Sequence, residues 1–186
     1  MKIYTIGHST HSKEEFISLL KAYNIQVLVD VRSYPGSRHV PQFNKEDMEK
    51  WVAEAGFKYI HLKDLGGRRK SNIEIDATLI EGWNQAAFKN YAGYSLTSEY
   101  RDGIEQLIGI ASESTVCYMC AEAVPWRCHR LLISNTLVTR GFDVFHIMSK
   151  TKTISHELGR YGAKPVINNG IITYPAEDSD SSPIKK

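Results

Sequence analysis

The residues of this sequence that are best suited to chemistry are concentrated in one short stretch, residues 120–130. Cys120 follows a strand-like apolar run and precedes a helical pattern, where a helix dipole and neighbouring cations favour a thiolate. Glu122 can act as an acid or a base if it is partly buried. We predict Cys120, Glu122 and His129 as catalytic residues, with Cys120 as a nucleophile or as a thiol that orients His129.

The three cysteines also have a purely structural interpretation. A free cysteine is often a small, inert core residue, and this is the default for Cys117, which lies inside a predicted strand. Residue type alone favours core or helix packing for Cys128, whereas nucleophile, ligand and core remain open for Cys120. A third possibility is a metal site made from the Cys/His set, although the spacing Cys-x7-Cys-His is not a standard zinc pattern. The members of that set are His8, Cys120, Cys128 and His129.

A second group of polar residues follows the first predicted strand. His8 sits in a tight turn after Gly7, from which its imidazole can be aimed at a bound ligand. Ser9 or Thr10 can donate a hydrogen bond to an anion. We predict His8 as a catalytic residue and Ser9 as a substrate-binding residue. The alternative is that Ser9, Thr10 or Ser12 only caps the first helix.

The second predicted strand ends in two opposite charges, Asp30 and Arg32. Asp30 closes a buried strand and is expected to pair with Arg32 or Arg38. A guanidinium in this position can fork onto a phosphate or a carboxylate. We predict Asp30 and Arg32 as substrate-binding residues, and favour a solvated loop for Arg38.

The irregular segment 63–96 begins with a Gly-Gly-Arg run and has the length of a functional loop or lid. Gly66 and Gly67 offer flexible backbone N–H groups and Arg68 adds a cation, a combination whose natural use is anion binding. A short helix is predicted around residues 79–88. Four aromatic side chains in this segment could cover a pocket or stack on a base, although core packing is commoner at such spacing. They are Trp83, Phe88, Tyr91 and Tyr94.

Strand-like and helical patterns alternate along the chain, which predicts a mainly parallel sheet with right-handed crossovers. We predict a Rossmann-like α/β fold with helices on both faces of the sheet, followed by a C-terminal β-hairpin over residues 165–174. Ligands of such folds bind beyond the carboxyl ends of the strands. The polar loops, and His146 at the end of the fifth strand, should therefore form one site. The predicted strands span residues 2–6, 25–31, 57–62, 115–120 and 142–148.

The helices between these strands have recognisable starting signals. Ser12, with Glu15 three residues later, forms a capping box at the start of the first helix. Asn44 and Thr97 are expected to cap two further helices. Pro125 suits the first turn of the helix that follows the fourth strand.

Length and composition fit one α/β domain over residues 1–175, followed by a disordered tail over residues 176–186. A net charge of +2 is too mild for a dedicated DNA-binding surface. An odd count of three cysteines excludes a disulfide scaffold and indicates a reducing compartment. No apolar run is long enough for a signal peptide or a membrane span, so we expect a cytoplasmic protein without a membrane partner.

Six short motifs occur in order along the chain: YTIGHST (4–10), VDVRSYP (29–35), LGGR (65–68), YAGY (91–94), CAE (120–122) and CHR (128–130). Together they resemble the bacterial and archaeal family called domain of unknown function 488 (DUF488), over about residues 1–150. The resemblance implies a stand-alone cytoplasmic α/β protein but supplies no reaction. It also favours a site role for Cys128 and His129 over simple packing. The substrate-binding residues predicted with its support are Ser9, Asp30, Arg32, Gly66, Gly67, Arg68, Cys128 and Arg130.

Three classes of function are consistent with this pattern. The first is an enzyme that acts on a phosphate-bearing substrate, a nucleotide or a nucleic acid, held by the arginines and the Gly-Gly amides. The second is a binding module that senses a nucleotide or a nucleic-acid end without turnover, and the third is a metal-binding protein. The chain lacks a Walker loop, a dinucleotide-binding glycine motif and a Cys-x5-Arg phosphatase loop, which counts against those common assignments. The sequence identifies no cofactor.

Overall fold

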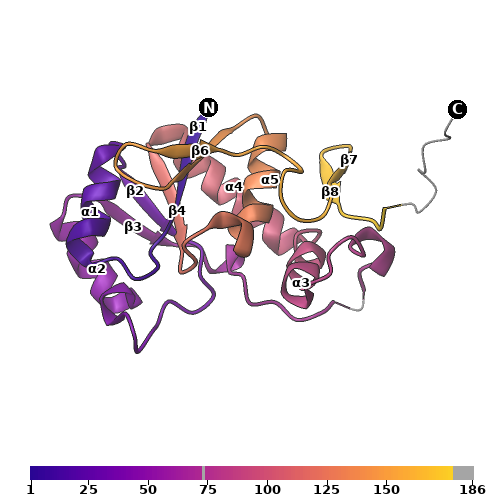
Figure 1. Cartoon of the computed structure of the whole chain (residues 1–186), viewed down its shortest axis with the longest axis horizontal. Coiled ribbons are helices and arrows are strands. Elements are labelled where there is room, and N and C mark those ends of the chain that lie inside the picture. Colours follow the sequence, from indigo (N-terminus) through magenta and orange to yellow (C-terminus); the bar gives the residue numbers. More distant parts are fainter. Residues whose placement is uncertain (73, 178–186) are drawn as a thin grey trace, which may run out of the picture.

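The molecule is built on a mostly parallel β-sheet, shown in Figure 1. The computed structural model describes residues 1–72 and 74–177 of the chain. Within these residues the strands lie in the order β3-β2-β4-β1-β5-β6, and only β6 runs antiparallel to its neighbour. The strands are β1 (Lys2–Gly7), β2 (Val27–Asp30), β3 (Lys58–His61), β4 (Val116–Cys120), β5 (Asp143–Ile147) and β6 (Thr153–Ser155).

Helices cover both faces of this sheet, because the side chains of its strands alternate between two apolar layers. On β4, Cys117 and Met119 pack with α1 and α2, whereas Tyr118 and Cys120 belong to the cluster formed with α3, α4 and α5. The predicted fold class, with helices on both faces, is therefore confirmed. The helices are α1 (Lys13–Ala22), α2 (Lys45–Glu54), α3 (Ala86–Tyr94), α4 (Ser98–Glu113) and α5 (Arg130–Thr139).

Two of the predicted helix caps are present, and a third residue takes a different role. Ser12 accepts a hydrogen bond from the Glu15 amide at 3.1 Å, and Thr97 caps α4 in the same way. Asn44 occupies the N-cap position of α2, but its side chain makes no capping bond. Instead, its Oδ1 accepts a hydrogen bond at 2.6 Å from the amide of Ser37 and so fixes the loop after β2.

Two helix boundaries differ from the sequence prediction. The helix predicted at 79–88 is wrong, since α3 begins at Ala86 after a separate 3₁₀ turn at Ala77–Leu79. Gly82 lies between them and donates its amide to the carbonyl of Tyr174, which replaces a helical hydrogen bond. Similarly, Pro125 starts a 3₁₀ turn rather than α5. The three-residue strand β6 has no counterpart in the sequence prediction.

The predicted C-terminal hairpin is confirmed as β7 (Val166–Asn168) and β8 (Ile171–Thr173). Asn169 and Gly170 both have positive φ angles, 49° and 78°, as a two-residue hairpin turn requires. Of the predicted tail over 176–186, residues 178–186 lie outside the described part of the chain. None of the helices in the described residues combines the length and the apolar character needed to cross a membrane.

His146 lies in a buried polar chain rather than in the predicted site. Its Nε2 contacts His156 Nδ1 at 3.0 Å, and His156 Nε2 contacts Asn135 Oδ1 at 2.8 Å. Asn135 in turn donates to the hydroxyl of Tyr174 at 2.8 Å. This series of hydrogen bonds connects β5 and α5 to the C-terminal segment. Burial lowers the pKa of His146 to about 3 and that of His156 to about 4, so both rings are neutral at pH 7.

We expect the protein to lose stability steeply as the pH falls below about 6.5, the pKa of a histidine in an unfolded chain. Because the folded pKa values of His146 and His156 are lower, the unfolded state binds more protons in this range, and their stabilising effect is complete only above that pH. The loss should be on the order of 2 kcal/mol for each histidine between pH 7 and pH 4.5. Urea unfolding at both pH values measures it.

The control for this prediction is a substitution that replaces one buried histidine by a side chain that fills the same space but does not titrate. H156Q should lose about 2 kcal/mol less stability on acidification than the wild type, because glutamine does not titrate. H11Q, at a partly exposed histidine that pairs with Glu15, should behave like the wild type. Equal acid losses in wild type and H156Q would contradict the assignment.

Candidate active site

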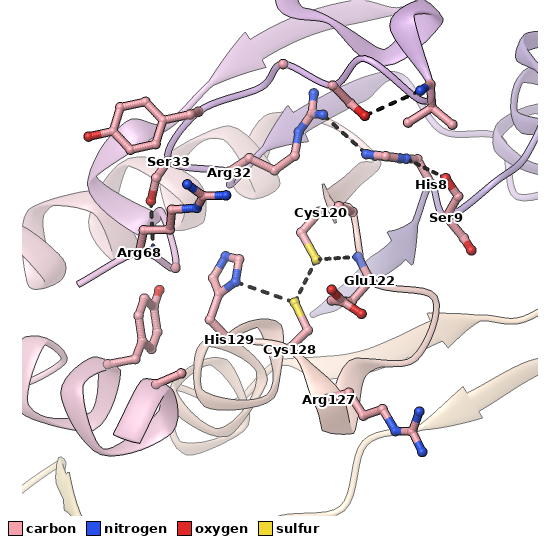
Figure 2. A pocket seen from close by; sticks show the side chains of 18 of the residues that line it. His8, Ser9, Arg32, Ser33, Arg68, Cys120, Glu122, Arg127, Cys128 and His129 are labelled. Atoms are coloured by element: carbon pink, nitrogen blue, oxygen red, sulfur yellow. Dashed lines mark hydrogen bonds between the residues drawn. The ribbon is translucent and has the colours of Figure 1, made fainter. Parts of the chain in front are cut away.

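The loops that follow β1, β2 and β4 meet around one cavity of about 520 Å³ (Figure 2). The three strands are adjacent, with Gly7 paired to Cys120 and Asp30 paired to Met119, so their carboxyl ends lie side by side. The predicted residues that line the cavity are His8, Ser9, Arg32, Gly67, Arg68, Cys120, Glu122, Cys128 and His129. The other three predicted residues, Asp30, Gly66 and Arg130, are buried and do not line the cavity.

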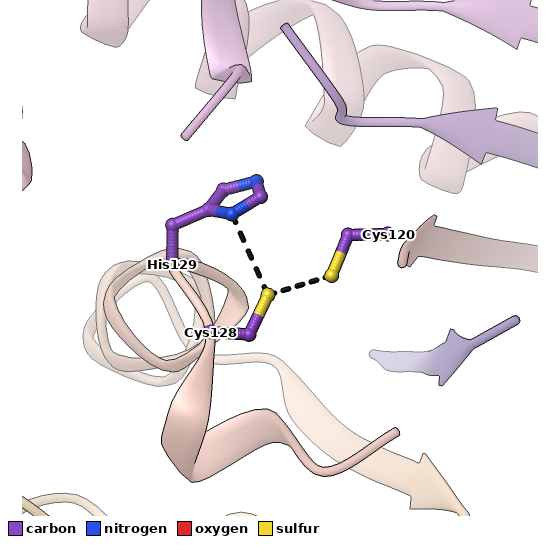
Figure 3. A group of neighbouring side chains, drawn as sticks. All are labelled: Cys120, Cys128 and His129. Carbon is purple, nitrogen blue, oxygen red and sulfur yellow. Dashed lines mark hydrogen bonds between the residues drawn. The ribbon is translucent and has the colours of Figure 1, made fainter. Parts of the chain in front are cut away.

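Two cysteines and a histidine form a contiguous cluster in the cavity wall (Figure 3). Cys128 Sγ lies 2.6 Å from Cys120 Sγ and 3.4 Å from His129 Nδ1. Cys120 comes from the end of β4 and Cys128 from the residues just before α5, so the intervening loop folds the two sulfurs together. Both thiols are almost completely buried but border the cavity.

A buried arginine lies directly behind the two sulfurs. Arg130 is only 1% exposed, and its Nε donates to Cys120 Sγ at 3.2 Å while its backbone amide donates to Cys128 Sγ at 3.5 Å. Among the described residues no carboxylate lies within ion-pair distance of this guanidinium. A buried cation needs a compensating charge, and a thiolate is the anion within reach.

The two sulfurs share this one negative charge, because ionising both at such close range would be prohibitive. Burial raises the pKa of Cys120 well above its usual value. Burial also opposes ionisation of Cys128, but the hydrogen bond from Cys120 and the charge of Arg130 outweigh it and lower the pKa of Cys128 to about 6. The N-terminus of α5 adds a favourable dipole. The raised pKa of Cys120 and the lowered pKa of Cys128 together favour the thiolate on Cys128, with Cys120 protonated.

His129 is oriented so that one ring nitrogen faces the thiol. Its Nε2 lies 2.7 Å from the carbonyl oxygen of Val31, to which it can only donate, so Nδ1 carries the free lone pair in the neutral ring. Burial lowers the pKa of His129 and favours this neutral form. Gly67 is required beside it, because a Cβ atom there would overlap the imidazole ring. The Nδ1 atom of His129 therefore lies beside Cys128 with its lone pair free to act as a base.

His8 is a neutral ring whose two nitrogens both have partners. It stacks on Phe43 with ring centroids 4.3 Å apart, and its Nδ1 donates to the Ser9 carbonyl at 3.0 Å. Nε2 accepts from Arg32 Nη1 at 3.2 Å. Burial lowers the pKa of His8 to about 4. In this geometry His8 positions Arg32, and a proton-transfer role for it stays a prediction.

Asp30 was predicted to pair with Arg32 or Arg38, and the structure shows the pair with Arg32, next to the cavity. Asp30 is fully buried and accepts from Arg32 Nη2 at 2.6 Å, from Arg32 Nε at 2.9 Å and from the Tyr59 hydroxyl at 2.7 Å. Arg32 Nη2 also donates to the carbonyl of Phe43. Nη1 contacts only His8 among the described residues, which leaves one of its hydrogens for a ligand.

Two exposed guanidinium groups border the cavity without a hydrogen-bond partner in the described part of the chain. Arg68 uses its backbone amide to bind Ser33 Oγ at 2.9 Å, while its guanidinium carbon lies 6.0 Å from the ring of Tyr34. Arg127 extends from the turn before α5 and lies on the opposite side of the cavity in Figure 2. A guanidinium group bordering a cavity can form charge-assisted hydrogen bonds to a bound anion.

The residues of the Gly-Gly-Arg-Arg run lie in two different environments. Gly67 and Arg68 line the cavity, whereas Gly66 and Arg69 do not. Gly66 donates its amide to the Lys63 carbonyl, so this N–H is not offered to a ligand. Arg69 turns away, with its guanidinium 3.6 Å from the ring of Tyr94. Of the four aromatics singled out in the sequence, Phe88 and Tyr91 line the cavity, whereas Trp83 stacks on Phe88 in the core.

Several lining residues were missed by sequence reasoning. Ser33, Tyr34 and Arg127 line the cavity but are not among the predicted site residues. The signal that could have identified Tyr34 is an aromatic residue between Arg32 and Pro35, directly after a buried strand. No sequence signal marks the Val31 carbonyl, which orients His129 through the backbone.

Cys120, Cys128 and His129 are also the group in the described residues that could hold a metal ion, with ligand atoms within 4.8 Å of one another. Two thiolates bound to one tetrahedral zinc ion, each at about 2.3 Å, lie about 3.8 Å apart. The sulfurs here are 2.6 Å apart, and Arg130 adds a positive charge beside them. A metal would therefore have to separate the two thiols, and the present geometry does not match two ligands of one zinc ion.

Fold and site together define a doubly wound α/β protein with a thiol–imidazole cluster in an arginine-bordered cavity at the carboxyl ends of its strands. The chain belongs to the family described as Domain of unknown function DUF488, whose family model matches residues 12–137. The match includes the cysteine cluster but begins after His8. Comparisons with curated proteins and with solved structures find no match.

Proposed function

We propose that the protein is an enzyme that uses the Cys128 thiolate as a nucleophile on a phosphate-bearing substrate, a nucleotide or a nucleic-acid end. The observation that carries this proposal is the position of Cys128 Sγ, 3.4 Å from His129 Nδ1 and beside a buried Arg130 that has no carboxylate partner among the described residues. A thiolate stabilised in this way and bordering a cavity is a typical catalytic nucleophile.

The rest of the cavity supports a phosphate-bearing substrate. Arg68 and Arg127 can each form charge-assisted hydrogen bonds to phosphate oxygens, and Arg32 offers a further N–H from a fixed position. The Tyr34 ring, which is 69% exposed at the border of the cavity, is available to stack on a base. A volume of about 520 Å³ is of the size that suits a mononucleotide.

The proposed reaction assigns each group a role. The sulfur of Cys128 attacks the electrophilic atom, the bond to the leaving group breaks, and Glu122 relays a proton from solvent to the leaving group. Glu122 is the acidic residue among the described lining residues. Water then hydrolyses the sulfur-bound intermediate with His129 Nδ1 as the base, and His129 returns the proton to solvent, so that the product is released and the thiolate is restored. The reducing cytoplasm, where we place the protein, keeps the thiols available for this step.

Binding is tested with reduced protein by measuring melting shifts with nucleoside mono-, di- and triphosphates and with short oligonucleotides. A ligand that binds the folded state raises the melting temperature, and the double variant R68M/R127M should weaken binding of that ligand by at least about tenfold. The control is R160M, which removes an exposed arginine paired with Glu157 away from the cavity and should leave binding unchanged. No shift with any of these ligands would contradict a phosphate-bearing substrate.

Catalysis is tested on whichever ligand binds. C128S should retain binding and lose product formation, whereas C117S, which alters a cysteine on the opposite face of the sheet, should retain both. Binding without turnover in the wild type would instead identify a binding module.

A further inference from the structure

The two sulfurs of the cluster are close enough to form a bond. Cys120 Sγ and Cys128 Sγ lie 2.6 Å apart, and a disulfide requires about 2.05 Å. The sulfurs would therefore have to approach by only about half an ångström to form the bond. Figure 3 shows both side chains pointing toward each other.

The third cysteine cannot take part in this bond. Cys117 lies three residues before Cys120 on the same strand, and its side chain packs in the apolar layer on the opposite face of the sheet. Burial also raises its pKa, so it remains a protonated and unreactive thiol. The fold therefore selects one pair, Cys120 and Cys128, out of the three possible pairings.

A small oxidant can reach the sulfur of this pair that carries the charge. Cys128 borders the cavity, and the cavity is open to solvent between the exposed residues Tyr34, Arg68 and Arg127. Cys120 also borders the cavity, with its sulfur 2.6 Å from that of Cys128. This is the arrangement of an attacking thiolate with a resolving thiol beside it.

We propose that Cys120 and Cys128 form a reversible disulfide when a peroxide enters the cavity, so that the site can be switched off by oxidation. Formation of the disulfide stands on the sulfur geometry alone, and its effect on activity rests on the proposed function. With both sulfurs in the disulfide, no thiolate remains for attack on a substrate. The protein would then respond to peroxide with a loss of activity that a dithiol reverses.

The chemistry balances with hydrogen peroxide as the oxidant. The Cys128 thiolate attacks one peroxide oxygen, the S–O bond forms, the O–O bond breaks, and Cys128 becomes a sulfenic acid with release of hydroxide. The hydroxide takes the proton of the Cys120 thiol and becomes water. The Cys120 thiolate then attacks Cys128 Sγ, the S–S bond forms, and the S–O bond breaks with loss of a second hydroxide.

Arg130 makes this disulfide readily reducible. In the dithiol form its buried charge faces a thiolate, but in the disulfide form no anion among the described residues compensates it. A charge that stabilises the reduced form raises the reduction potential of the couple. The disulfide should therefore form on exposure to peroxide and be reversed by mild dithiols, as a switch requires.

The test uses the full chain, reduced with dithiothreitol, desalted and treated with a small molar excess of hydrogen peroxide. Titration of thiols after denaturation should fall from the three cysteines of the sequence to one, and the intact mass should fall by two hydrogen atoms. Peptide mapping should show Cys120 linked to Cys128. Dithiothreitol should restore all three thiols.

Three variants make the result decisive. C117S should still form the disulfide, C120S should stop at a sulfenic acid on Cys128 that dimedone traps, and C128S should do neither. The proposal is overturned if the wild type keeps three thiols under this treatment, if Cys117 enters the disulfide, or if C120S and wild type give the same product. One zinc ion per purified chain that blocks oxidation also overturns it. Nucleotide binding is measured on reduced protein, in which the disulfide is absent. The proposed function and the proposed disulfide can therefore fail independently of each other.

Discussion

Replacing Arg130 by methionine is expected to slow the alkylation of Cys128 at pH 7 by at least about tenfold. Arg130 is the cation that stabilises the shared thiolate, and without it the burial of both sulfurs favours the neutral thiols. If the pKa of Cys128 rises from about 6 to the ordinary value of a thiol, about 8.5, only a few per cent remains ionised at pH 7. Iodoacetamide labelling followed by mass spectrometry of the Cys128 peptide measures the rate.

The matched control for R130M is R140M, which removes an exposed arginine from the other end of the same helix, where it pairs with Glu105. Its alkylation rate should equal that of the wild type. A second measurement needs no variant: ultraviolet absorbance of the wild-type thiolate, titrated between pH 4 and pH 9, should change with a midpoint near the pKa of Cys128. An unchanged rate in folded R130M, or a midpoint at the ordinary thiol value, would show that Arg130 does not stabilise a thiolate.

The fold could be predicted because each of its main elements has a strong local signal. The buried strands read as continuous apolar runs, and caps such as Ser12 and Thr97 mark where helices begin. The alternation of the two then implies a parallel sheet, and ligand sites of parallel sheets lie at the strand ends. Failures occurred where tertiary contacts decide the local structure. At Gly82, for example, a hydrogen bond to the distant Tyr174 carbonyl replaces the helix predicted there.

The site was predictable only in its composition. Asp30 and Arg32 are two residues apart at the end of a buried strand, so their pairing could be predicted, and it is confirmed. The direction in which side chains turn could not be predicted. Arg130 was predicted to bind substrate, but it is buried behind the sulfurs, and the contact between Cys120 and Cys128 depends on the path of the loop between them. That path is set by Gly7, where a Cβ atom would overlap the Glu122 carbonyl.

Replacing Asp30 by asparagine is expected to destabilise the fold by about 3–5 kcal/mol, the usual cost of removing one partner of a buried ion pair. Asp30 and Arg32 are both buried, and Asp30 is the carboxylate among the described residues within ion-pair distance of this guanidinium. Without its charge, Arg32 keeps a buried positive charge with only neutral partners, the Phe43 carbonyl and His8. Urea unfolding followed by circular dichroism measures the change.

Two further variants separate the charge effect from the loss of a single hydrogen bond. Y59F removes only the hydroxyl that donates to Asp30 Oδ2, and it should cost about 1 kcal/mol. The double variant D30N/R32M removes both charges and should be more stable than D30N alone, since no uncompensated cation remains in the interior. If D30N were no less stable than Y59F, the Asp30–Arg32 ion pair would not be a main source of stability next to the cavity. The fixed position of Arg32 beside His8 would then need another explanation.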